Sequence, residues 1–322
     1  MKKELSYLET IKAIDEIKKY FESQLEVRLS LTKVQSPLFV KSDTGLQDEL
    51  SGVEKSVSFT KDKEKFEIVH SLAKWKRVAL GKYEFPLHTG LLTDMKAIRK
   101  DEVIDTVHSL YVEQWDWEKV ISKEDRTIEY LKDTVRSIYK ALRQTEIYVK
   151  KKYRYVTLDL PKTISFITTQ ELEDMYPDKT PKEREDLITR DKKAVFIIGI
   201  GDKLKSGIIH DTRSPDYDDW SLDGDMLIYD KKIDKVMEIT SMGIRVDEES
   251  LLSQLEKSGC MDRITLPYHQ MIEKKEIPYS IGGGIGISRL LMLLLEKSHI
   301  VEVQASSWSK KTLSTLKDKR IL

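Results

Sequence analysis

A cluster of glycines followed by an arginine lies in the segment YSIGGGIGISRLLMLLL (279–295). Four of the five residues from Gly282 to Gly286 are glycines, and Arg289 comes three positions later. Glycine has no Cβ, so its backbone can approach a phosphate or a flat ring closely, and an arginine beside it can bind an anion or stack on a base. The segment therefore predicts a site for a phosphate-bearing ligand, with close packing alone as the alternative.

Two carboxylates lie in segments that predict a β-hairpin, DMLIYD (225–230) and KVMEIT (235–240). A turn centred on the Lys231–Lys232 bond would place Asp225 directly opposite Glu238 on one face of the sheet. Like charges side by side are destabilising, and a divalent cation removes the conflict. Mg²⁺ favours one or two carboxylates together with substrate phosphates, so the pair predicts a Mg²⁺ site. Solvation, or pairing with nearby lysines, is the alternative.

Two arginines could bind anions. Arg245 follows Glu238 by seven residues and stands beyond a glycine, from where its fork could hold a carboxylate. Arg99 ends an apparent strand and precedes the strand that carries Gln114 and Asp116, so it could lie over a phosphate. An ordinary surface ion pair is the alternative for either arginine.

Two further segments are dense in functional side chains. HDTRSPDYDDW (210–220) is a proline-interrupted, aspartate-rich loop, and loops of this kind often carry function. The alternative interpretation of this segment is a solvated acidic loop without a functional role. In HSLAKWKR (70–77), strand-like alternation predicts Lys74 and Lys76 on one face and Trp75 on the other.

These side chains must be positioned by a mixture of helices and hairpins. The order of the segments favours an α+β fold with a mainly antiparallel sheet flanked by helices, because strands follow one another and helices come in separate blocks. No repeat or linker divides the chain, so we expect a single domain over 1–322. The apolar pattern predicts helices over 8–21 and 128–142, short strand-like pieces within 27–40, and strands over 66–72, 108–117, 194–201, 225–230 and 235–240.

The strand over 108–117 also separates polar from aromatic residues. Its alternation sends Gln114 and Asp116 to one face and Trp115 and Trp117 to the other.

Composition excludes several classes of protein. Lys+Arg and Asp+Glu are both 55, so no charge excess suggests a nucleic-acid or membrane partner. We find no signal peptide and no apolar run of membrane-spanning length. The one cysteine, Cys260, excludes a disulfide framework and a cysteine-rich metal site. The histidines lack metal-ligand spacing, and a cytoplasmic location is expected.

Together these segments resemble the catalytic core of class II aminoacyl-tRNA synthetases. VQSPLFV, with Pro37, is similar to the first motif of that core, which usually builds a dimer interface. Arg99 stands as the second-motif arginine that holds the α-phosphate of ATP, and Arg289 as the third-motif arginine that packs against the adenine and outer phosphates. Asp225 and Glu238 fall where aspartate-type members hold Mg²⁺.

The resemblance is closer to the ammonia-dependent asparagine synthetases (aspartate–ammonia ligases), which share this fold without a tRNA-binding domain. It extends from about residue 5 to about residue 309 and implies a homodimer. The matching stretches are QDELSG (47–52), VHSLAKWKR (69–77), YVEQWDWE (111–118), RSPDYDDWS (213–221), SMGIRVD (241–247) and IGGGIGISRL (281–290).

This resemblance implies the formation of L-asparagine from L-aspartate, ATP and ammonia, with AMP and pyrophosphate released through a β-aspartyl adenylate, in the presence of Mg²⁺. The implied aspartate-binding residues are Ser71, Lys76, Gln114, Asp116, Arg213, Ser241 and Arg245. The implied ATP-binding residues are Arg99, Asp218, Glu238, Gly284, Gly286 and Arg289. The implied catalytic residues are Asp48, Arg99, Asp116, Asp218 and Arg289, and the implied metal ligands are Asp225 and Glu238.

Several roles and functions stay open at this point. Lys76 and Arg245 are candidates for the carboxylate of aspartate that is not activated, and Asp48 and Asp218 are both candidates for ammonia. A tRNA synthetase or its paralogue is disfavoured because we expect no anticodon-binding domain and the net charge is zero. Glutamine-dependent synthesis needs a nucleophilic thiol, for which Cys260 has no supporting pattern. A regulatory paralogue is disfavoured by the intact motif residues, and a dinucleotide-binding oxidoreductase by the position of the glycines late in the chain.

Overall fold

The computed structural model describes residues 5–50, 54–316 and 319–322. The helices are α1 (Tyr7–Leu29), α2 (Ala73–Lys82), α3 (Ile128–Lys152), α4 (Thr169–Met175), α5 (Pro181–Lys192), α6 (Glu248–Lys257), α7 (Pro267–Glu273), α8 (Ile287–Leu294) and α9 (Lys310–Thr315), with 3-10 turns η1 (Ser42–Thr44), η2 (Met261–Thr265) and η3 (Ile300–Glu302). The strands are β1 (Leu31–Lys33), β2 (Phe39–Lys41), β3 (Ser58–Lys61), β4 (Glu64–Ile68), β5 (Gly90–Ile98), β6 (Tyr111–Val120), β7 (Ser165–Thr168), β8 (Ala194–Ile198), β9 (Asp218–Asp230), β10 (Lys235–Arg245) and β11 (Ser280–Gly286).

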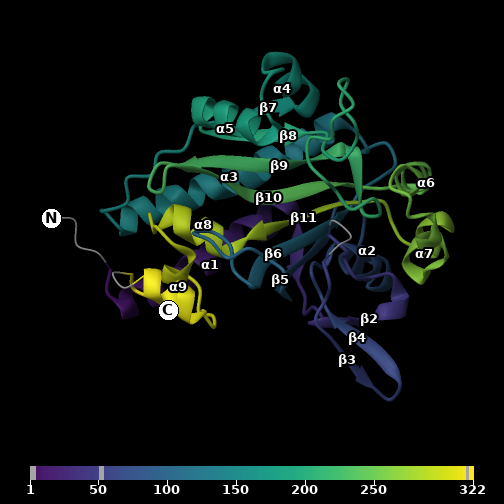
Figure 1. The fold of residues 1–322 in the computed structure, drawn as a ribbon, viewed down its shortest axis with the longest axis horizontal. Helices are drawn as coiled ribbons and strands as arrows, with labels where there is room; N and C mark the ends of the chain where they lie inside the picture. Colours follow the sequence, from purple (N-terminus) through teal and green to yellow (C-terminus); the bar gives the residue numbers. More distant parts are fainter. Residues whose placement is uncertain (1–4, 51–53, 317–318) are drawn as a thin grey trace.

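An eight-stranded sheet of order β1-β5-β6-β11-β10-β9-β8-β7 runs through the molecule (Figure 1). Only the two outermost pairings, β1 with β5 and β7 with β8, are parallel, and the pairings between them are antiparallel. The predicted α+β class with a mainly antiparallel sheet is therefore confirmed. A separate three-stranded sheet, β2-β4-β3, projects beside α2 in the same figure.

One face of the large sheet is covered by long helices and forms the main core. Phe21 of α1, Ile138 of α3 and Leu290 of α8 pack in one cluster with Trp115 and Trp117 of β6. The predicted alternation along β6 is confirmed, since both tryptophans are fully buried in this core. The opposite face is covered only at its ends, by α4 and α5 at one and by α2, α6 and α7 at the other, which leaves room between them (Figure 1).

The prediction of a strand over 70–77 is wrong. β4 ends at Ile68, and α2 begins at Ala73. Lys74 and Lys76 do not share a strand face, because two positions along an α-helix differ by roughly 200° in direction. Both lysines are nevertheless buried, and each meets a different carboxylate.

The described helices are all too short or too polar to cross a membrane.

Candidate active site

The open face of the large sheet carries polar residues in register across its central strands. Residues directly paired across neighbouring strands point to the same face, so the register defines a row that crosses six strands. That row consists of Ile197, Asp225, Ser241, Gly284, Asp116 and Thr93. It lies on the face opposite the tryptophan-lined core and forms the floor of the site.

The predicted pairing of Asp225 with Glu238 is wrong. Lys235 pairs with Asp230, so the turn is centred one residue later than predicted, and Asp225 lies opposite Ser241. A β-bulge in β10 between Glu238 and Thr240 adds one residue to that strand. Because a bulge re-aims the side chains that follow it, Glu238 and Ser241 share the open face although they are three residues apart.

The glycine cluster forms strand β11 and the start of α8. A Cβ on Gly282 would overlap the carboxylate of Glu118 and the guanidinium of Arg245, and a Cβ on Gly284 would overlap the amide of Gln114. Glycine is therefore required here because side chains from β6 and β10 lie across the strand.

Two adjoining cavities lie on this face. The larger, of about 330 Å³, is bordered by Asp48, Lys76, Arg213, Arg245 and other polar residues. The second is bordered by Arg289 and by residues of β6 and of the chain after α8. The walls shared by both are Arg99, Glu102, Gln114, Glu238 and Gly284. A ligand with two parts could therefore place one part in each cavity, with its middle in contact with these five shared residues.

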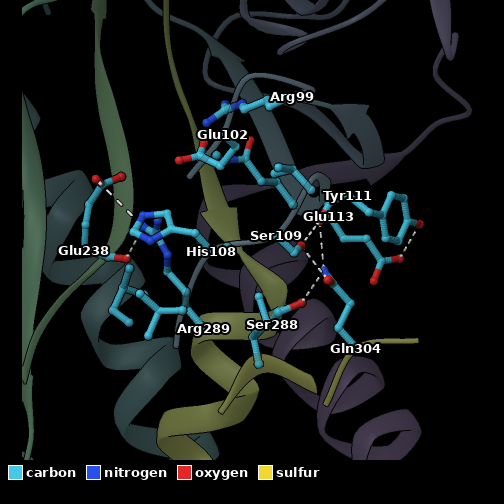
Figure 2. A pocket seen from close by; sticks show the side chains of 17 residues that line it. Arg99, Glu102, His108, Ser109, Tyr111, Glu113, Glu238, Ser288, Arg289 and Gln304 are labelled. Atoms are coloured by element: carbon cyan, nitrogen blue, oxygen red, sulfur yellow. Dashed lines mark hydrogen bonds and ion pairs between the residues drawn. The ribbon is translucent and has the colours of Figure 1, made fainter. Parts of the chain in front are cut away.

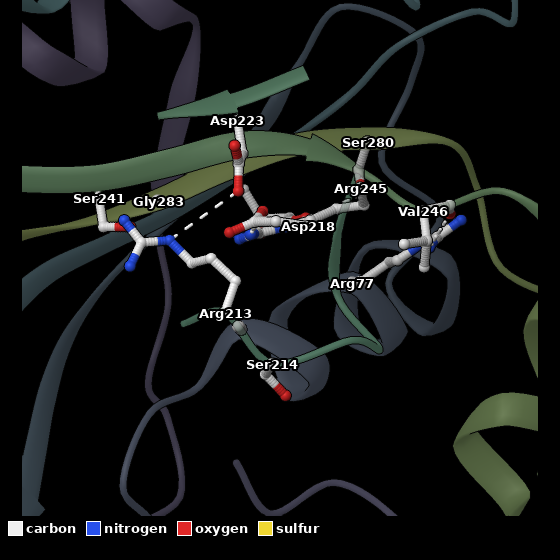
Figure 3. A network of polar contacts seen from close by, with 12 residues as sticks. Arg77, Arg213, Ser214, Asp218, Asp223, Ser241, Arg245, Val246, Ser280 and Gly283 are labelled. Carbon is white, nitrogen blue, oxygen red and sulfur yellow. Dashed lines mark hydrogen bonds and ion pairs between the residues drawn. The ribbon is translucent and has the colours of Figure 1, made fainter. Parts of the chain in front are cut away.

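In the larger cavity, Arg245 is held by two carboxylates. Its Nε and Nη2 donate to the two oxygens of Glu118 at 2.8 and 2.6 Å, and its Nη1 donates to Asp218. Figure 3 shows Asp218 and Arg245 side by side. Arg77 lies farther along, where its guanidinium donates to the carbonyl of Val246 at 2.7 Å. Burial opposes the charge of Arg245, but the two carboxylates outweigh it and raise its pKa well above its usual range.

Lys76 forms the second cationic centre of this cavity. Its Nζ donates to Asp116 and to the carbonyl of Gly283 at 3.1 Å, and it lies 3.8 Å from Glu118. Burial raises the pKa of Asp116 despite the charge of Lys76. Glu118 is also buried, but Arg245 and Lys76 outweigh its desolvation and lower its pKa. Lys76 and Arg245 thus lie among three carboxylates, those of Asp116, Glu118 and Asp218.

Arg213 reaches the floor from the 210–217 loop. It donates through Nη2 to Asp225, and its Nε lies 3.9 Å from Asp223, as the dashed line in Figure 3 shows. Within the described chain, Oδ1 of Asp225 is buried without a hydrogen-bond partner. Burial, together with the charge of Glu238, raises the pKa of Asp225 to about 6 against the opposing effect of Arg213.

Asp48 borders the cavity from a different side. Its carboxylate accepts from the Ser71 hydroxyl at 2.7 Å and from the Leu50 amide at 2.8 Å. Its loop is held by Lys74, which donates to the carbonyl of Gln47 at 2.9 Å and to the fully buried Asp216 at 2.7 Å. The Lys74–Asp216 pair thus joins the loop of Asp48 to the loop of Arg213.

The second cavity has two arginines whose hydrogen bonds go to main-chain carbonyl oxygens, and one of them, Arg289, also forms a long ion pair with Glu238. Arg99 donates to the carbonyl of His70 at 3.3 and 3.4 Å, and Arg289 donates to the carbonyl of Glu238 at 3.0 Å. Figure 2 shows Arg99 and Glu102 at one end of this cavity and Arg289 near Glu238 and His108. The nearest carboxylate to Arg289 is that of Glu238, at 3.8 Å.

The structure gathers nearly all of the predicted site residues around these cavities. The predicted residues that line one or both cavities are Asp48, Ser71, Lys76, Arg99, Gln114, Asp116, Arg213, Asp218, Glu238, Ser241, Arg245, Gly284, Gly286 and Arg289. Asp225 lies behind them, with Arg213 between it and the larger cavity.

Sequence reasoning missed several residues of the site. Glu118 could have been found, because it continues the alternation of Gln114 and Asp116 along β6. Glu102, His108 and Gln304 border the second cavity from irregular segments, where no periodicity marks them.

Comparison with known proteins gives a consistent result. The family model for aspartate–ammonia ligase matches residues 8–320. The aspartate–ammonia ligase of Clostridium perfringens (strain SM101 / Type A) is 54% identical over 320 residues, which is 98% of this chain and 95% of the relative. That of Lactiplantibacillus plantarum is 55% identical over 309 residues, 95% of this chain and 96% of the relative.

Solved structures share the fold. Asparaginyl-tRNA synthetase of Entamoeba histolytica, in complex with asparaginyl-adenylate, has a TM-score of 0.62 at 15% identity and covers 92% of this chain. The chain spans 66% of that synthetase, slightly less than two thirds. The enzyme of Pyrococcus horikoshii gives a TM-score of 0.62 at 14% identity, with 91% of this chain and 67% of that chain covered. The predicted class II aminoacyl-tRNA synthetase fold is confirmed.

Proposed function

This chain belongs to the aspartate–ammonia ligase family, and from that premise we propose that it makes L-asparagine from L-aspartate and ammonia while cleaving ATP to AMP and pyrophosphate. The observation that carries this function is the pair of adjoining cavities on one sheet face, because the reaction must join an amino acid to a nucleotide. The larger cavity offers cations and carboxylates for aspartate, and the second offers two arginines for ATP.

The chemistry requires an activated carboxylate. A free carboxylate is a poor acyl donor because its oxygen is a poor leaving group. Attack of the aspartate side-chain carboxylate on the α-phosphorus of ATP forms a β-aspartyl adenylate and releases pyrophosphate. Ammonia then attacks the β-carbonyl carbon, the bond to the AMP oxygen breaks, and AMP leaves with that electron pair.

We assign the α-phosphate to Arg99 and the outer phosphates to Arg289. Arg99 borders both cavities, and the α-phosphorus must lie where they meet. Preorganised cations aimed at a developing negative charge are among the largest contributions to catalysis. Arg289 borders only the nucleotide-side cavity, which fits contact with the adenine and the departing pyrophosphate. Gly284 and Gly286 border the nucleotide from β11.

The amino acid would be held by its α-carboxylate and α-ammonium groups. Lys76 and Arg245 are the proposed partners of the α-carboxylate, with Arg213 and Ser241 beside them. Ser71, Gln114 and Asp116 are the proposed acceptors for the α-ammonium group. The α-carboxylate of aspartate would then face cations, and its α-ammonium group would face hydrogen-bond acceptors.

Of the two candidates for ammonia, Asp48 is better supported than Asp218. Asp218 is already bound by Arg245. Within the described chain, the carboxylate of Asp48 accepts hydrogen bonds from the neutral donors of Ser71 and Leu50. A carboxylate without a cationic partner can hold ammonium and accept a proton as ammonia is released, so we assign this step to Asp48.

The donor set at Asp225 and Glu238 fits Mg²⁺. Oδ1 of Asp225 is a buried acceptor without a partner among the described residues, and carboxylate oxygens are preferred Mg²⁺ ligands. The described part of the chain contains no group of three or more acidic, histidine or cysteine residues arranged for a metal, which agrees with two carboxylates completed by ATP. When bound, Mg²⁺ would neutralise charge on the triphosphate.

We also propose that residues 1–322 act as one adenylating domain in the cytoplasm and form a homodimer. One large sheet connects the N-terminal and C-terminal halves, which supports a single catalytic unit. Leu8 and Ile11 of α1 are 60% and 51% exposed. Apolar side chains on an outward helix face suit a partner.

A product assay tests the function. Purified protein is supplied with L-aspartate, ATP and Mg²⁺, and with ammonium chloride or glutamine in separate reactions. We expect asparagine and AMP in equal amounts with ammonium, and little product with glutamine. ADP in place of AMP would contradict the adenylate route, and equal rates with glutamine would contradict ammonia as the nitrogen donor.

A further inference from the structure

A buried glutamine near the C-terminal end joins three parts of the nucleotide-side cavity. Gln304 is 2% exposed and follows η3. Its Nε2 donates to the carbonyl of Tyr111 and to the hydroxyl of Ser288, each at 3.0 Å. Its Oε1 lies 2.6 Å from the hydroxyl of Ser109, which shares its one hydrogen between this oxygen and the carbonyl of Tyr111, also at 2.6 Å. Figure 2 shows Gln304 between Ser109 and Ser288, on the side of the cavity away from Glu238. Gln304 lies outside every motif used above.

The orientation of this amide follows from its partners. The carbonyl of Tyr111 can only accept a hydrogen bond, so the amide nitrogen must face it, and the amide oxygen must then face Ser109. The second hydrogen on nitrogen goes to Ser288. Because Ser288 accepts from Gln304, its own hydroxyl hydrogen remains available, and Ser288 borders the cavity. Gln304 thus makes Ser288 a hydrogen-bond donor toward a ligand.

Gln304 also anchors a loop that otherwise has few buried residues. The loop runs from Arg99 to Leu110, which are joined by a backbone hydrogen bond of 2.9 Å at its base. Val103 in this loop is 80% exposed, whereas Ser109 is 4% exposed and is bonded to Gln304. Loops with few buried contacts open most easily, so the Ser109 contact restrains this wall of the cavity.

The restrained segment, Ser109–Tyr111, lies at the part of the cavity where the base of a nucleotide could be bound. β11 ends at Gly286, which pairs with Gln114, so β6 residues before Gln114 extend beyond the end of β11. Tyr111 and Val112 in that part of β6 border the cavity. Main-chain groups at an unpaired strand end can bind the edge of a base, provided that the strand is held in place.

We propose that Gln304 is a positioning residue for the purine ring of ATP. It holds the Ser109–Tyr111 segment against α8 and directs the Ser288 hydroxyl as a donor. Adenine has an unprotonated N1 that accepts such a bond, whereas guanine carries a hydrogen on N1, so this arrangement favours ATP over GTP. The inference rests on the proposed use of ATP and extends it to a residue that sets the choice of base.

The substitution Gln304→Met tests this role, because methionine keeps the length of the side chain and removes all three hydrogen bonds. We expect the KM for ATP to rise by about tenfold or more, since each lost bond contributes a factor of several. The preference for ATP over GTP in kcat/KM should fall by a similar factor. The KM for aspartate should stay within about twofold of wild type.

Gln254 offers a matched control. It is 4% exposed and also makes three hydrogen bonds, from its Nε2 to the carbonyls of Pro215 and Asp218 and from the Trp220 amide to its Oε1. These partners lie beside the larger cavity. Gln254→Met removes as many buried hydrogen bonds and should lower the melting temperature similarly, but it should change the kinetics of aspartate and leave the ATP-to-GTP preference unchanged.

The outcomes separate this inference from the proposed function. Absence of AMP formation by the wild-type chain would contradict the function itself. If the wild type is active, the inference is overturned by a folded Gln304→Met variant with unchanged ATP KM and base preference, or by equal rises in both KM values. If Gln304→Met does not fold, Ser288→Ala removes only the hydroxyl. A fall in ATP preference then supports the proposal, and an unchanged preference overturns it.

Discussion

At the scale of single residues, the two sides of the site differ in how their cations are neutralised. Lys76, Arg245 and Arg213 each contact a carboxylate of the protein. Arg99 and Arg289 instead donate to main-chain carbonyls. The cations of the larger cavity are therefore already paired with carboxylates of the protein, whereas Arg99 and Arg289 keep more of their positive charge available for an anionic ligand.

The first prediction concerns these two arginines. Arg99→Ala and Arg289→Ala should each lower kcat/KM by well over tenfold, because a charge-assisted contact made at the transition state contributes a few kcal/mol. Steady-state AMP formation measures the loss. Near-normal turnover in either variant would remove that arginine from the mechanism.

A second prediction at this scale concerns stability. Asp230 accepts from the Lys232 amide, while its other oxygen, Oδ2, is buried without a partner among the described residues. Burial raises the pKa of Asp230 from 3.8 to about 6. The folded state then binds this proton more tightly than the unfolded state, so the stability of the wild type falls as pH rises from about 4 to about 6.

Asp230→Asn should keep the bond from Lys232 and abolish this loss. We expect a melting temperature higher by a few degrees at pH 8 and little changed at pH 4, measured by calorimetry across that range. A variant that is no more stable than wild type at pH 8 would show that the charge of Asp230 carries no cost.

At the scale of elements, β10 and β11 position the site through departures from regular strands. The bulge after Glu238 brings that carboxylate to the face of Ser241. The glycines of β11 leave space through which Glu118 and Arg245 meet. Neither strand could present these groups if it were regular and fully substituted with side chains.

The third prediction follows from this geometry. In Gly282→Ala the new Cβ would overlap the Glu118 carboxylate and the Arg245 guanidinium, so their bidentate contact must break. We expect at least a tenfold loss in kcat/KM for aspartate, consistent with the loss of a charged contact of about 1.5–3 kcal/mol. Initial rates at varied aspartate measure it.

Gly81→Ala is the matched control. Gly81 lies inside α2, where a Cβ would come no closer than 3.3 Å to Pro278, and alanine favours a helix. Activity close to wild type is expected. Equal losses in both variants would show that any added methyl group harms the protein and that Gly282 has no special role.

At the scale of the whole molecule, one sheet joins residues from β5 near the start of the chain to β11 near its end. The helices on one side form a continuous core, and the site occupies the uncovered centre of the other side (Figure 1). The helix α1 exposes Leu8 and Ile11, which are 60% and 51% exposed.

The fourth prediction concerns assembly. Sedimentation equilibrium should give a mass of twice 37.5 kDa, because burying Leu8 and Ile11 between two copies removes apolar surface from water. Leu8→Lys together with Ile11→Lys should shift the protein toward monomer. A monomeric wild type at micromolar concentration would exclude the homodimer, and an unchanged mass in the double variant would place the interface elsewhere.

The sequence alone determined the features that depend on local periodicity and on motif identity. Alternation along 108–117 placed Gln114 and Asp116 opposite Trp115 and Trp117, and the family motifs identified the residues that line the cavities. Both signals are contained in short stretches of chain, because the period of a strand is a property of its own backbone.

Only the tertiary structure decided which residues meet. The pairing of Asp225 with Ser241 depends on a turn and a bulge whose positions are set by packing on both sides of the sheet. The segment Ala73–Lys82 is a helix instead of the predicted strand, and its Lys74 and Lys76 reach separate buried carboxylates from distant parts of the chain. Gln304 lies 195 residues from Ser109 in sequence and has no local pattern. Contacts between distant segments are selected by the free energy of the whole fold, which no single stretch of residues contains.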